Sequence, residues 1–274
     1  MSEQRPEIAN TVQTGKFKTN YHDVGSGYPV VLLHGSGPGV TAWANWNKLF
    51  PLWKEEFRVL APDMMGFGFT ERPKNPVFSM NNWVRQTIDF LDALHIEKCN
   101  LVGNSFGGAL ALSMAIKYPQ RINKLVLMGS MGVSFPITYG LDRVWGYTPS
   151  FANMEELLEL FTYDHSFATE ELIKTRYESS MQPGFQESFS AMFPAPRQQG
   201  VEGMAGNEHY IRGIPHETLV IHGREDRVIP LENSLKLVQM IVNAQLYVFG
   251  KCGHWTQIEH TEEFAQLVGS FFKR

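Results

Sequence analysis

The chain has 274 residues, of which 43% are hydrophobic, and its formal net charge at pH 7 is −4. This length suits one large α/β domain or two smaller domains with a sizeable core, and the mild negative charge gives no reason to expect nucleic acid or an anionic membrane as partner. Residues 1–10 lack the apolar stretch of a secretory signal, and no apolar run approaches the roughly 20 residues of a membrane span. Cys99 and Cys252 make no disulfide framework, so we expect a cytoplasmic protein with reduced, buried cysteines.

Strands and helices alternate along residues 1–132, which we assign to the first part of a core domain. The predicted strands are short apolar runs bounded by turn residues, at 17–23, 29–33, 57–61, 99–102 and 124–128. The predicted helices lie between them, at 42–53, 81–94 and 109–116. Uninterrupted apolar runs are typical of strands buried on both faces, so the pattern predicts a mostly parallel, doubly wound α/β sheet.

The segment Gly103-Asn104-Ser105-Phe106-Gly107 has the form G-x-S-x-G and lies between a predicted strand and a predicted helix. In such a nucleophile elbow the serine occupies a sharp turn that exposes its hydroxyl above the carboxyl edge of the sheet. The backbone N–H of the following residue lies at a helix N-terminus, aimed where an oxyanion would form. We therefore predict Ser105 as the nucleophile and Phe106 as an oxyanion donor. The alternative is a glycine-rich turn that carries a solvated serine.

Residues 133–213 differ in character, because they are rich in Phe, Met, Tyr and Pro and contain no buried-strand pattern. Asn153 is a candidate cap for a helix at 154–161, and Thr169 is a candidate cap for a second helix with two glutamates in its first turn. A block of about 80 residues is too long for a plain loop. We predict a helical lid inserted after a core strand.

Residues 214–274 return to the core pattern, with strands and helices predicted at 218–222, 230–242, 245–249 and 258–272. A serine hydroxyl needs a base, and the base needs an orienting group. Loops that follow strands of such a sheet are where these residues are found. The loop after the first strand of this part contains Glu225 and Asp226, and the loop after the second contains His254. We predict His254 as general base and then general acid, and Asp226 as its carboxylate, with Glu225 competing on spacing alone.

The glycine-rich loop 34–39 is predicted to supply a second oxyanion donor, the N–H of Ser36 or Gly37. A phosphate-binding loop is disfavoured, because neither G-K-[ST] nor a helix-opening G-x-G-x-x-G is present. His34 is expected to make structural hydrogen bonds. Cys252 is disfavoured as a nucleophile, since it lacks an elbow and lies two residues before His254. The histidines and cysteines show no zinc spacing, so we expect no metal and no cofactor.

These residues resemble those of the α/β-hydrolase superfamily, in which the order Ser, Asp, His is also found. Further segments resemble the meta-cleavage product hydrolases, which cleave carbon–carbon bonds in aromatic catabolism. They lie in the elbow, the glycine loop, the lid and the region of His254, at 34–46, 103–108, 132–138, 183–189, 192–198 and 252–260. The lid segments look most like the branch that acts on ring-fission products of monocyclic aromatics.

The resemblance also implies substrate-binding residues. Four positions match those that hold the carboxylate and dienol end of the substrate, namely Asn45, Asn104, Arg176 and Trp255. An arginine suits this role because a guanidinium binds a carboxylate bidentately. The acyl-side pocket would be lined by Met131, Trp145, Val201 and Ile229. The bulk of Met131 points to a small acyl group.

The implied reaction is hydrolysis of a carbon–carbon bond in a vinylogous 1,5-diketone, by a homo-oligomer whose partner is a small-molecule substrate. A carboxylesterase of the same fold shares every triad feature, and a non-enzymatic small-ligand receptor of this fold is a further alternative. Haloalkane dehalogenases and epoxide hydrolases need a carboxylate at the elbow, where this chain has Ser105.

Overall fold

The computed structural model describes residues 5–274, so the first four residues of the N-terminal stretch considered above lie outside it. Within this range one sheet of eight strands has the order β1-β2-β4-β3-β5-β6-β7-β8. The strands are β1 (Asn10–Thr14), β2 (Phe17–Val24), β3 (Tyr28–Leu33), β4 (Phe57–Pro62), β5 (Cys99–Asn104), β6 (Ile122–Met128), β7 (Thr218–Gly223) and β8 (Ala244–Phe249). The pairs β1–β2 and β2–β4 are antiparallel, and the other five pairs are parallel. The predicted mostly parallel sheet is confirmed.

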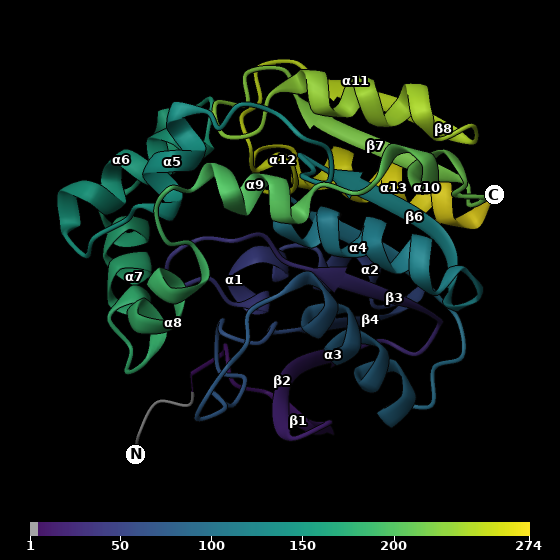
Figure 1. Cartoon of the computed structure of the whole chain (residues 1–274), viewed down its shortest axis with the longest axis horizontal. Helices are drawn as coiled ribbons and strands as arrows, with labels where there is room; N and C mark the ends of the chain where they lie inside the picture. The colour runs from purple at the N-terminus through teal and green to yellow at the C-terminus, as the bar shows by residue number, and fades with distance from the viewer. Residues whose placement is uncertain (1–4) are drawn as a thin grey trace.

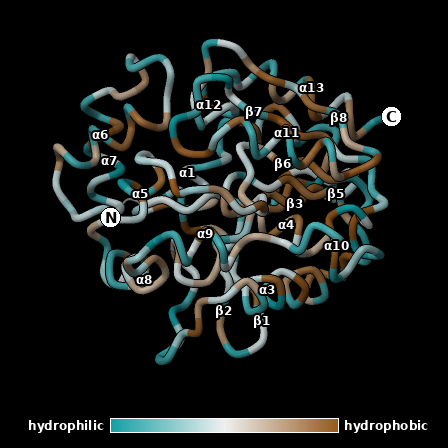
Figure 2. The backbone as a smooth tube through the Cα atoms, turned by 45° about the horizontal axis from the view of Figure 1, so that its top comes forward, coloured by the Kyte–Doolittle hydropathy of each residue, from teal (hydrophilic) through white to brown (hydrophobic). Residues whose placement is uncertain are grey.

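Helices cover both faces of the sheet (Figure 1). One face carries α3 (Met80–Ala93), α4 (Phe106–Lys117) and α11 (Leu231–Met240), and the other carries α1 (Ala42–Trp46), α2 (Phe50–Trp53) and α13 (Thr261–Lys273). Alternate strand residues enter the two cores, which is why the strands read as continuous apolar runs. In β3, for example, Val31 and Leu33 pack on one side, and Val30 and Leu32 on the other. Figure 2 shows the resulting hydrophobic centre and the more hydrophilic periphery.

Six α-helices, one short 3₁₀ helix (His165–Phe167) and no strand lie between β6 and β7 in the described chain. The α-helices are α5 (Tyr139–Trp145), α6 (Phe151–Phe161), α7 (Glu170–Ser180), α8 (Phe185–Met192), α9 (Gln198–Met204) and α10 (Glu208–Arg212). Hydrogen bonds join this segment to loops of the core: the N–H of His254 donates to the Phe161 carbonyl at 2.7 Å, and Trp145 Nε1 donates to Ser36 Oγ at 2.9 Å. The helical segment therefore lies over the loops that follow β3 and β8 (Figure 1). Its extent of 133–213 and its role as a lid stay predictions.

Two predicted helices are each broken in the structure. The helix predicted at 42–53 is divided into α1 and α2, because Pro51 has no N–H to continue the ladder and its ring would clash with the carbonyl of Asn47. The helix predicted at 258–272 is divided into α12 (Thr256–Glu259) and α13 at His260, whose φ of −125° and ψ of 49° are not helical. The His260 ring bonds Glu263 at 3.0 Å and stacks on Phe249, so tertiary contacts hold this break.

Three local signals had different outcomes. Strand β1 was not predicted from the sequence; its polar residues pair with β2 at the edge of the sheet. The prediction of Asn153 as a cap was wrong, because helix α6 begins three residues earlier and the Asn153 N–H donates to Ser150 Oγ at 3.0 Å. The cap at Thr169 is confirmed, since its hydroxyl accepts from the Leu172 N–H at 3.2 Å. Among residues 5–274, no helix combines the length and apolar character needed to span a bilayer.

Candidate active site

Ser105 lies on the sharp turn between β5 and α4. Its φ of 54° and ψ of −113° are unusual for a residue with a Cβ atom, and neighbouring backbone holds it there. The Ser105 N–H donates to the Met128 carbonyl at 2.9 Å, and its carbonyl accepts from the Met131 N–H at 3.1 Å. A Cβ atom on Gly103 would lie 2.2 Å from the Gly107 carbonyl oxygen, and one on Gly107 would lie 2.2 Å from that of Leu33. Both glycines of the motif are therefore required by close backbone packing.

Asp226 and His254 form a buried hydrogen-bonded pair, although 28 positions separate them. Nδ1 of His254 lies 2.7 Å from Oδ2 of Asp226, and the side chains are 3% and 1% exposed. The other carboxylate oxygen accepts from the N–H groups of Val228 and Ile229 at 2.8 and 2.9 Å. Burial by itself would raise the pKa of Asp226, but the positive charge and hydrogen bond of His254, aided by His222 and the Ile229 N–H, hold that pKa below its usual value. The geometry thus places Asp226 against the His254 ring, where it was predicted to lie.

Ser105 and His254 both adjoin the end of strand β6. Ser105 bonds the Met128 carbonyl, and a Cβ atom on the next residue, Gly129, would lie 3.1 Å from His254 Nδ1. Neither the Ser105 hydroxyl nor His254 Nε2 has a hydrogen-bond partner among residues 5–274. Catalytic hydrogen bonds are often loose before substrate binds. Both side chains are buried, at 3% and 2% exposed, and no side chain intervenes at Gly129.

A second histidine near Asp226 was missed from the sequence. His222 belongs to strand β7, whereas catalytic residues were expected on the loops that follow strands. Its Nε2 lies 3.4 Å from Asp226 Oδ2 and 3.0 Å from the Ile229 carbonyl, and its Nδ1 lies 2.7 Å from Ser234 Oγ. Burial lowers the pKa of His222, so the ring is neutral at pH 7. The spacing of four residues between His222 and Asp226 was the available signal.

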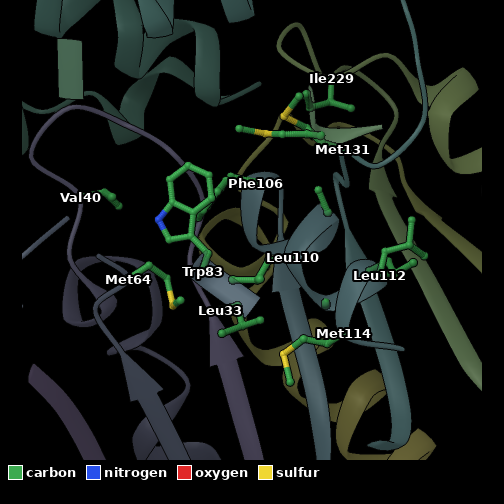
Figure 3. Packing of buried hydrophobic residues seen from close by; sticks show 14 of the residues in the cluster. Leu33, Val40, Met64, Trp83, Phe106, Leu110, Leu112, Met114, Met131 and Ile229 are labelled. Carbon is green, nitrogen blue, oxygen red and sulfur yellow. The ribbon is translucent and has the colours of Figure 1, made fainter. Parts of the chain in front are cut away.

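The predicted oxyanion donors surround the elbow. Phe106 is the first residue of α4, so its N–H has no partner within the helix by position, and its ring packs edge-on against Trp83 at 4.8 Å (Figure 3). The glycine loop lies against the elbow, because a Cβ atom on Gly35 would lie 2.5 Å from Asn104 Oδ1 and 3.4 Å from the Cβ of Ser105. Ser36 and Gly37 follow directly in this loop and line the adjacent cavity.

A cavity with an empty volume of about 490 Å³ lies beside this centre. Its polar lining includes His254 together with three residues that were predicted to bind substrate, Asn45, Asn104 and Arg176. The side-chain nitrogens of both asparagines are buried and have no hydrogen-bond partner within the described residues. Trp255 and further apolar side chains complete the wall, namely Pro38, Val40, Met154, Leu158, Phe161 and Ile258. Two unsatisfied amide donors in one cavity indicate a site for a polar ligand with acceptor atoms.

Arg176 is a buried cation in this cavity. It is 8% exposed, and its Nη2 donates to the Ala44 carbonyl at 2.9 Å while the guanidinium stacks over the Trp255 ring at 5.2 Å. It forms no salt bridge with any residue in 5–274, and burial lowers its pKa to about 10, which the more distant carboxylate of Glu7 opposes. A buried arginine without an acidic partner favours an anionic ligand.

The four residues predicted for the acyl side do not line this cavity in the described chain. Met131, Trp145, Val201 and Ile229 are buried in one hydrophobic cluster, and Figure 3 shows Met131 and Ile229 close together in it. Trp145 bonds Ser36 and stacks on Phe193 at 4.5 Å. Their assignment to the acyl side stays a prediction, whereas six apolar residues that do line the cavity were not predicted, namely Pro38, Val40, Met154, Leu158, Phe161 and Ile258.

Other candidate groups have structural surroundings. His34 Nε2 accepts from the Met64 N–H at 3.0 Å, its Nδ1 donates to the Gly35 carbonyl at 2.8 Å, and burial lowers its pKa to about 4. Cys99 and Cys252 are free and buried, and burial raises the pKa of Cys252 far above its usual value, which disfavours a thiolate. Nowhere in residues 5–274 do three or more His, Cys, Asp or Glu side chains gather as a metal site would require.

Comparison with known proteins agrees with this geometry. The family described as alpha/beta hydrolase fold matches residues 28–261. The chain is 57% identical over 266 residues to 2-hydroxymuconate semialdehyde hydrolase of Pseudomonas sp. strain CF600, covering 97% of this chain and 94% of the relative. It is 54% identical over 271 residues to 2-hydroxy-6-oxo-2,4-heptadienoate hydrolase of Pseudomonas putida, covering 99% and 98%.

Solved structures of related hydrolases are also similar to this chain over nearly its whole length. A meta-cleavage product hydrolase from Pseudomonas fluorescens IP01, a serine-to-alanine variant complexed with acetates, superimposes with a TM-score of 0.97 at 54% identity, covering 98% of this chain and 99% of that one. The enzyme 2-hydroxy-6-oxo-6-phenylhexa-2,4-dienoate hydrolase from a Rhodococcus species has a TM-score of 0.91 at 33% identity, covering 96% of this chain and 98% of that one. Together with the geometry of the site, this similarity shows that the chain belongs to the meta-cleavage product hydrolases of the α/β-hydrolase fold.

Proposed function

We propose that the protein hydrolyses the carbon–carbon bond of 2-hydroxymuconate semialdehyde or of a 2-hydroxy-6-oxo-hexa- or hepta-2,4-dienoate. The products are 2-hydroxypenta-2,4-dienoate and formate or a small carboxylate, in the meta-cleavage degradation of monocyclic aromatics. The names of the relatives above 50% identity support this substrate class. The observation that carries the proposal is that Arg176 is buried, without a salt-bridge partner in the described chain, in the same cavity as His254. An ordinary ester has no anionic group that could pair with this cation.

The polar end of the cavity suits the carboxylate and dienol oxygens. Arg176 supplies a cation, and the amides of Asn45 and Asn104 supply donors that lack protein partners. Trp255 flanks the site and holds the guanidinium by stacking. A bound carboxylate would satisfy these donors and offset the burial of the arginine charge.

The chemical steps use the groups around the elbow. A proton first moves to carbon 5 of the dienol, which gives a keto form whose later carbanion is delocalised. His254 then takes the proton of Ser105 Oγ, and this oxygen attacks the carbon 6 carbonyl. The N–H of Phe106 and that of Ser36 or Gly37 stabilise the oxyanion, each worth roughly 2.7–4 kcal/mol. Asp226 holds the imidazole in the required tautomer and stabilises its positive form.

Cleavage of the bond between carbons 5 and 6 leaves the acyl group on Ser105, and the electron pair is delocalised from carbon 5 onto the carbon 2 oxygen as a dienolate. This oxygen takes the proton from the protonated His254, which gives 2-hydroxypenta-2,4-dienoate. Water then hydrolyses the ester and regenerates the serine, so one water is consumed for each bond broken. We assign the acyl side to Met131, Trp145, Val201 and Ile229, all of which are at most 2% exposed. A small group on carbon 6, hydrogen or methyl, fits this packing.

The test follows the loss of the visible absorbance of the dienolate for the semialdehyde and for its methyl and phenyl ketones, beside p-nitrophenyl esters. We expect turnover of the semialdehyde or methyl ketone, and near abolition of turnover by Ser105→Ala with dienolate binding retained. Ser113→Ala, on the same helix α4, is the control and should keep wild-type turnover. Ester hydrolysis without dienolate turnover would indicate a carboxylesterase, and saturable binding without turnover would indicate a receptor.

A homo-oligomer and a cytoplasmic location are part of the same proposal. The family resemblance supports assembly, and the two free cysteines suit a reducing compartment. Light scattering on the purified protein tests the assembly, since a monomeric mass at micromolar concentration would contradict it.

A further inference from the structure

A second cavity adjoins the active-site cavity and shares four of its residues. Its empty volume is about 930 Å³. The shared residues form a wall between the two spaces and are Asn45, Arg176, Trp255 and Ile258. The remaining lining comes from the end of α1, from the segment 166–172 and from Lys48. The outer cavity therefore touches the active site at the end that holds Arg176.

Exposure increases from this wall outward. Asn45, Arg176 and Trp255 are buried, whereas Lys48 and Thr169 at the other side of the outer cavity are exposed. Of the residues that line the inner cavity, all described, only Gly37 and Ile258 are partly exposed. Gly37 lies beneath the ring of Phe161, which a Cβ atom there would meet at 4.0 Å. Ile258 belongs to the shared wall, so the wall is the side on which the inner cavity is nearest to solvent.

The charges along this path have one sign. Lys48 and Arg176 are the charged residues of the outer lining, and no carboxylate lines it in the described chain. Lys48 is in no salt bridge with residues 5–274, and its ammonium group lies 5.5 Å from the centre of the Phe167 ring. Two cations without a salt-bridge partner among residues 5–274 attract anions along one path and raise their local concentration.

We propose that the outer cavity is an entrance vestibule for the carboxylate-bearing substrate, in which Lys48 attracts the carboxylate and passes it to Arg176 through the wall at Trp255 and Ile258. The vestibule rests on the proposed function, since it presumes an anionic substrate. It assigns Lys48 to capture and not to the chemical step. Leu172, which lines only the outer cavity, is then part of the passage.

The experiment measures the association rate of the dienolate with the Ser105→Ala protein by stopped-flow absorbance at several salt concentrations. Adding Lys48→Glu is expected to slow association by about tenfold at low salt and to flatten its salt dependence. Lys54→Glu is the matched control, because Lys54 is an exposed cation in neither cavity, and it should leave the rate unchanged. In otherwise wild-type protein, Lys48→Glu should leave kcat unchanged.

A second pair of variants tests the passage by volume. Leu172→Trp should slow association, whereas Leu235→Trp, at an exposed position on α11, should not. If Lys48→Glu and Leu172→Trp associate with the dienolate as fast as their control variants do, the proposed entrance vestibule is wrong. A wild-type protein that neither binds nor turns over the dienolate would instead contradict the proposed function, so the two failures are distinguishable.

Discussion

Replacing Arg176 with methionine tests the site at its most unusual feature, a buried cation without an acidic partner. If the guanidinium binds the substrate carboxylate, its removal leaves a buried anion unpaired, at a cost of about 3–5 kcal/mol. This corresponds to a loss of roughly 10²- to 10⁴-fold in kcat/KM. Methionine keeps the length and apolar stem of the side chain, so packing against Trp255 is largely preserved.

Stability is expected to change in the opposite direction. Burial lowers the pKa of Arg176 from 12.5 to about 10, so the folded state disfavours the charged form by about 3 kcal/mol at neutral pH. The free energy of unfolding of Arg176→Met should therefore be unchanged or higher, even though the variant loses the hydrogen bond to the Ala44 carbonyl. A structural arginine would give the reverse result.

The assay combines dienolate turnover with urea unfolding of the same preparations. Lys174→Met is the control, because Lys174 lies on the same helix α7 in an exposed pair with Glu178 at 3.9 Å, and such pairs contribute little. Unchanged kcat/KM in Arg176→Met, or a fall in unfolding free energy that matches the lost activity, would refute the reasoning.

Three further predictions concern the triad, the acyl side and acid stability. Asp226→Asn should lower kcat roughly 10⁴-fold, the loss that the wrong imidazole tautomer causes in other Ser-His-Asp enzymes, with little change in dienolate affinity; wild-type kcat would exclude Asp226 as the orienting group. Met131→Ala should raise the activity on the phenyl ketone relative to the semialdehyde and lower the unfolding free energy by about 2–5 kcal/mol; an unchanged substrate ratio would remove Met131 from the acyl side. For His34, the folded pKa of about 4 lies below the usual 6.5, so its stabilisation is complete above pH 6.5 and is lost as the pH falls towards 4. Burial raises the pKa of Asp63 to about 6, so the contribution of Asp63 to the free energy of unfolding rises as the pH falls from 6 to 4 and opposes that of His34. In urea unfolding at a series of pH values, Asp63→Asn should therefore reveal the full loss of about 3 kcal/mol from His34. The further substitution His34→Gln should abolish this loss.

Much of the fold was readable from sequence because its signals are local. Continuous apolar runs predicted β3, β4 and β6 to within two residues at either end, since a parallel strand covered on both faces needs no polar alternation. The elbow was readable because Gly103 and Gly107 lie within four residues of each other and of Ser105. Loops after strands then identified Asp226 and His254, whose pairing at 2.7 Å the structure shows.

Other features depend on residues that meet only through packing. The tertiary structure was needed to find the helix breaks at His260 and between α1 and α2. It was also needed to find the approach of His222 to Asp226 and the position of Arg176 between Trp255 and the Ala44 carbonyl. Periodicity and turn chemistry act over a few positions, so the sequence by itself determined strands, caps and the elbow. Contacts between segments more than a hundred positions apart, such as Arg176 and Ala44, decide which side chains border the cavity. These contacts follow from how helices pack over a sheet and not from any local pattern.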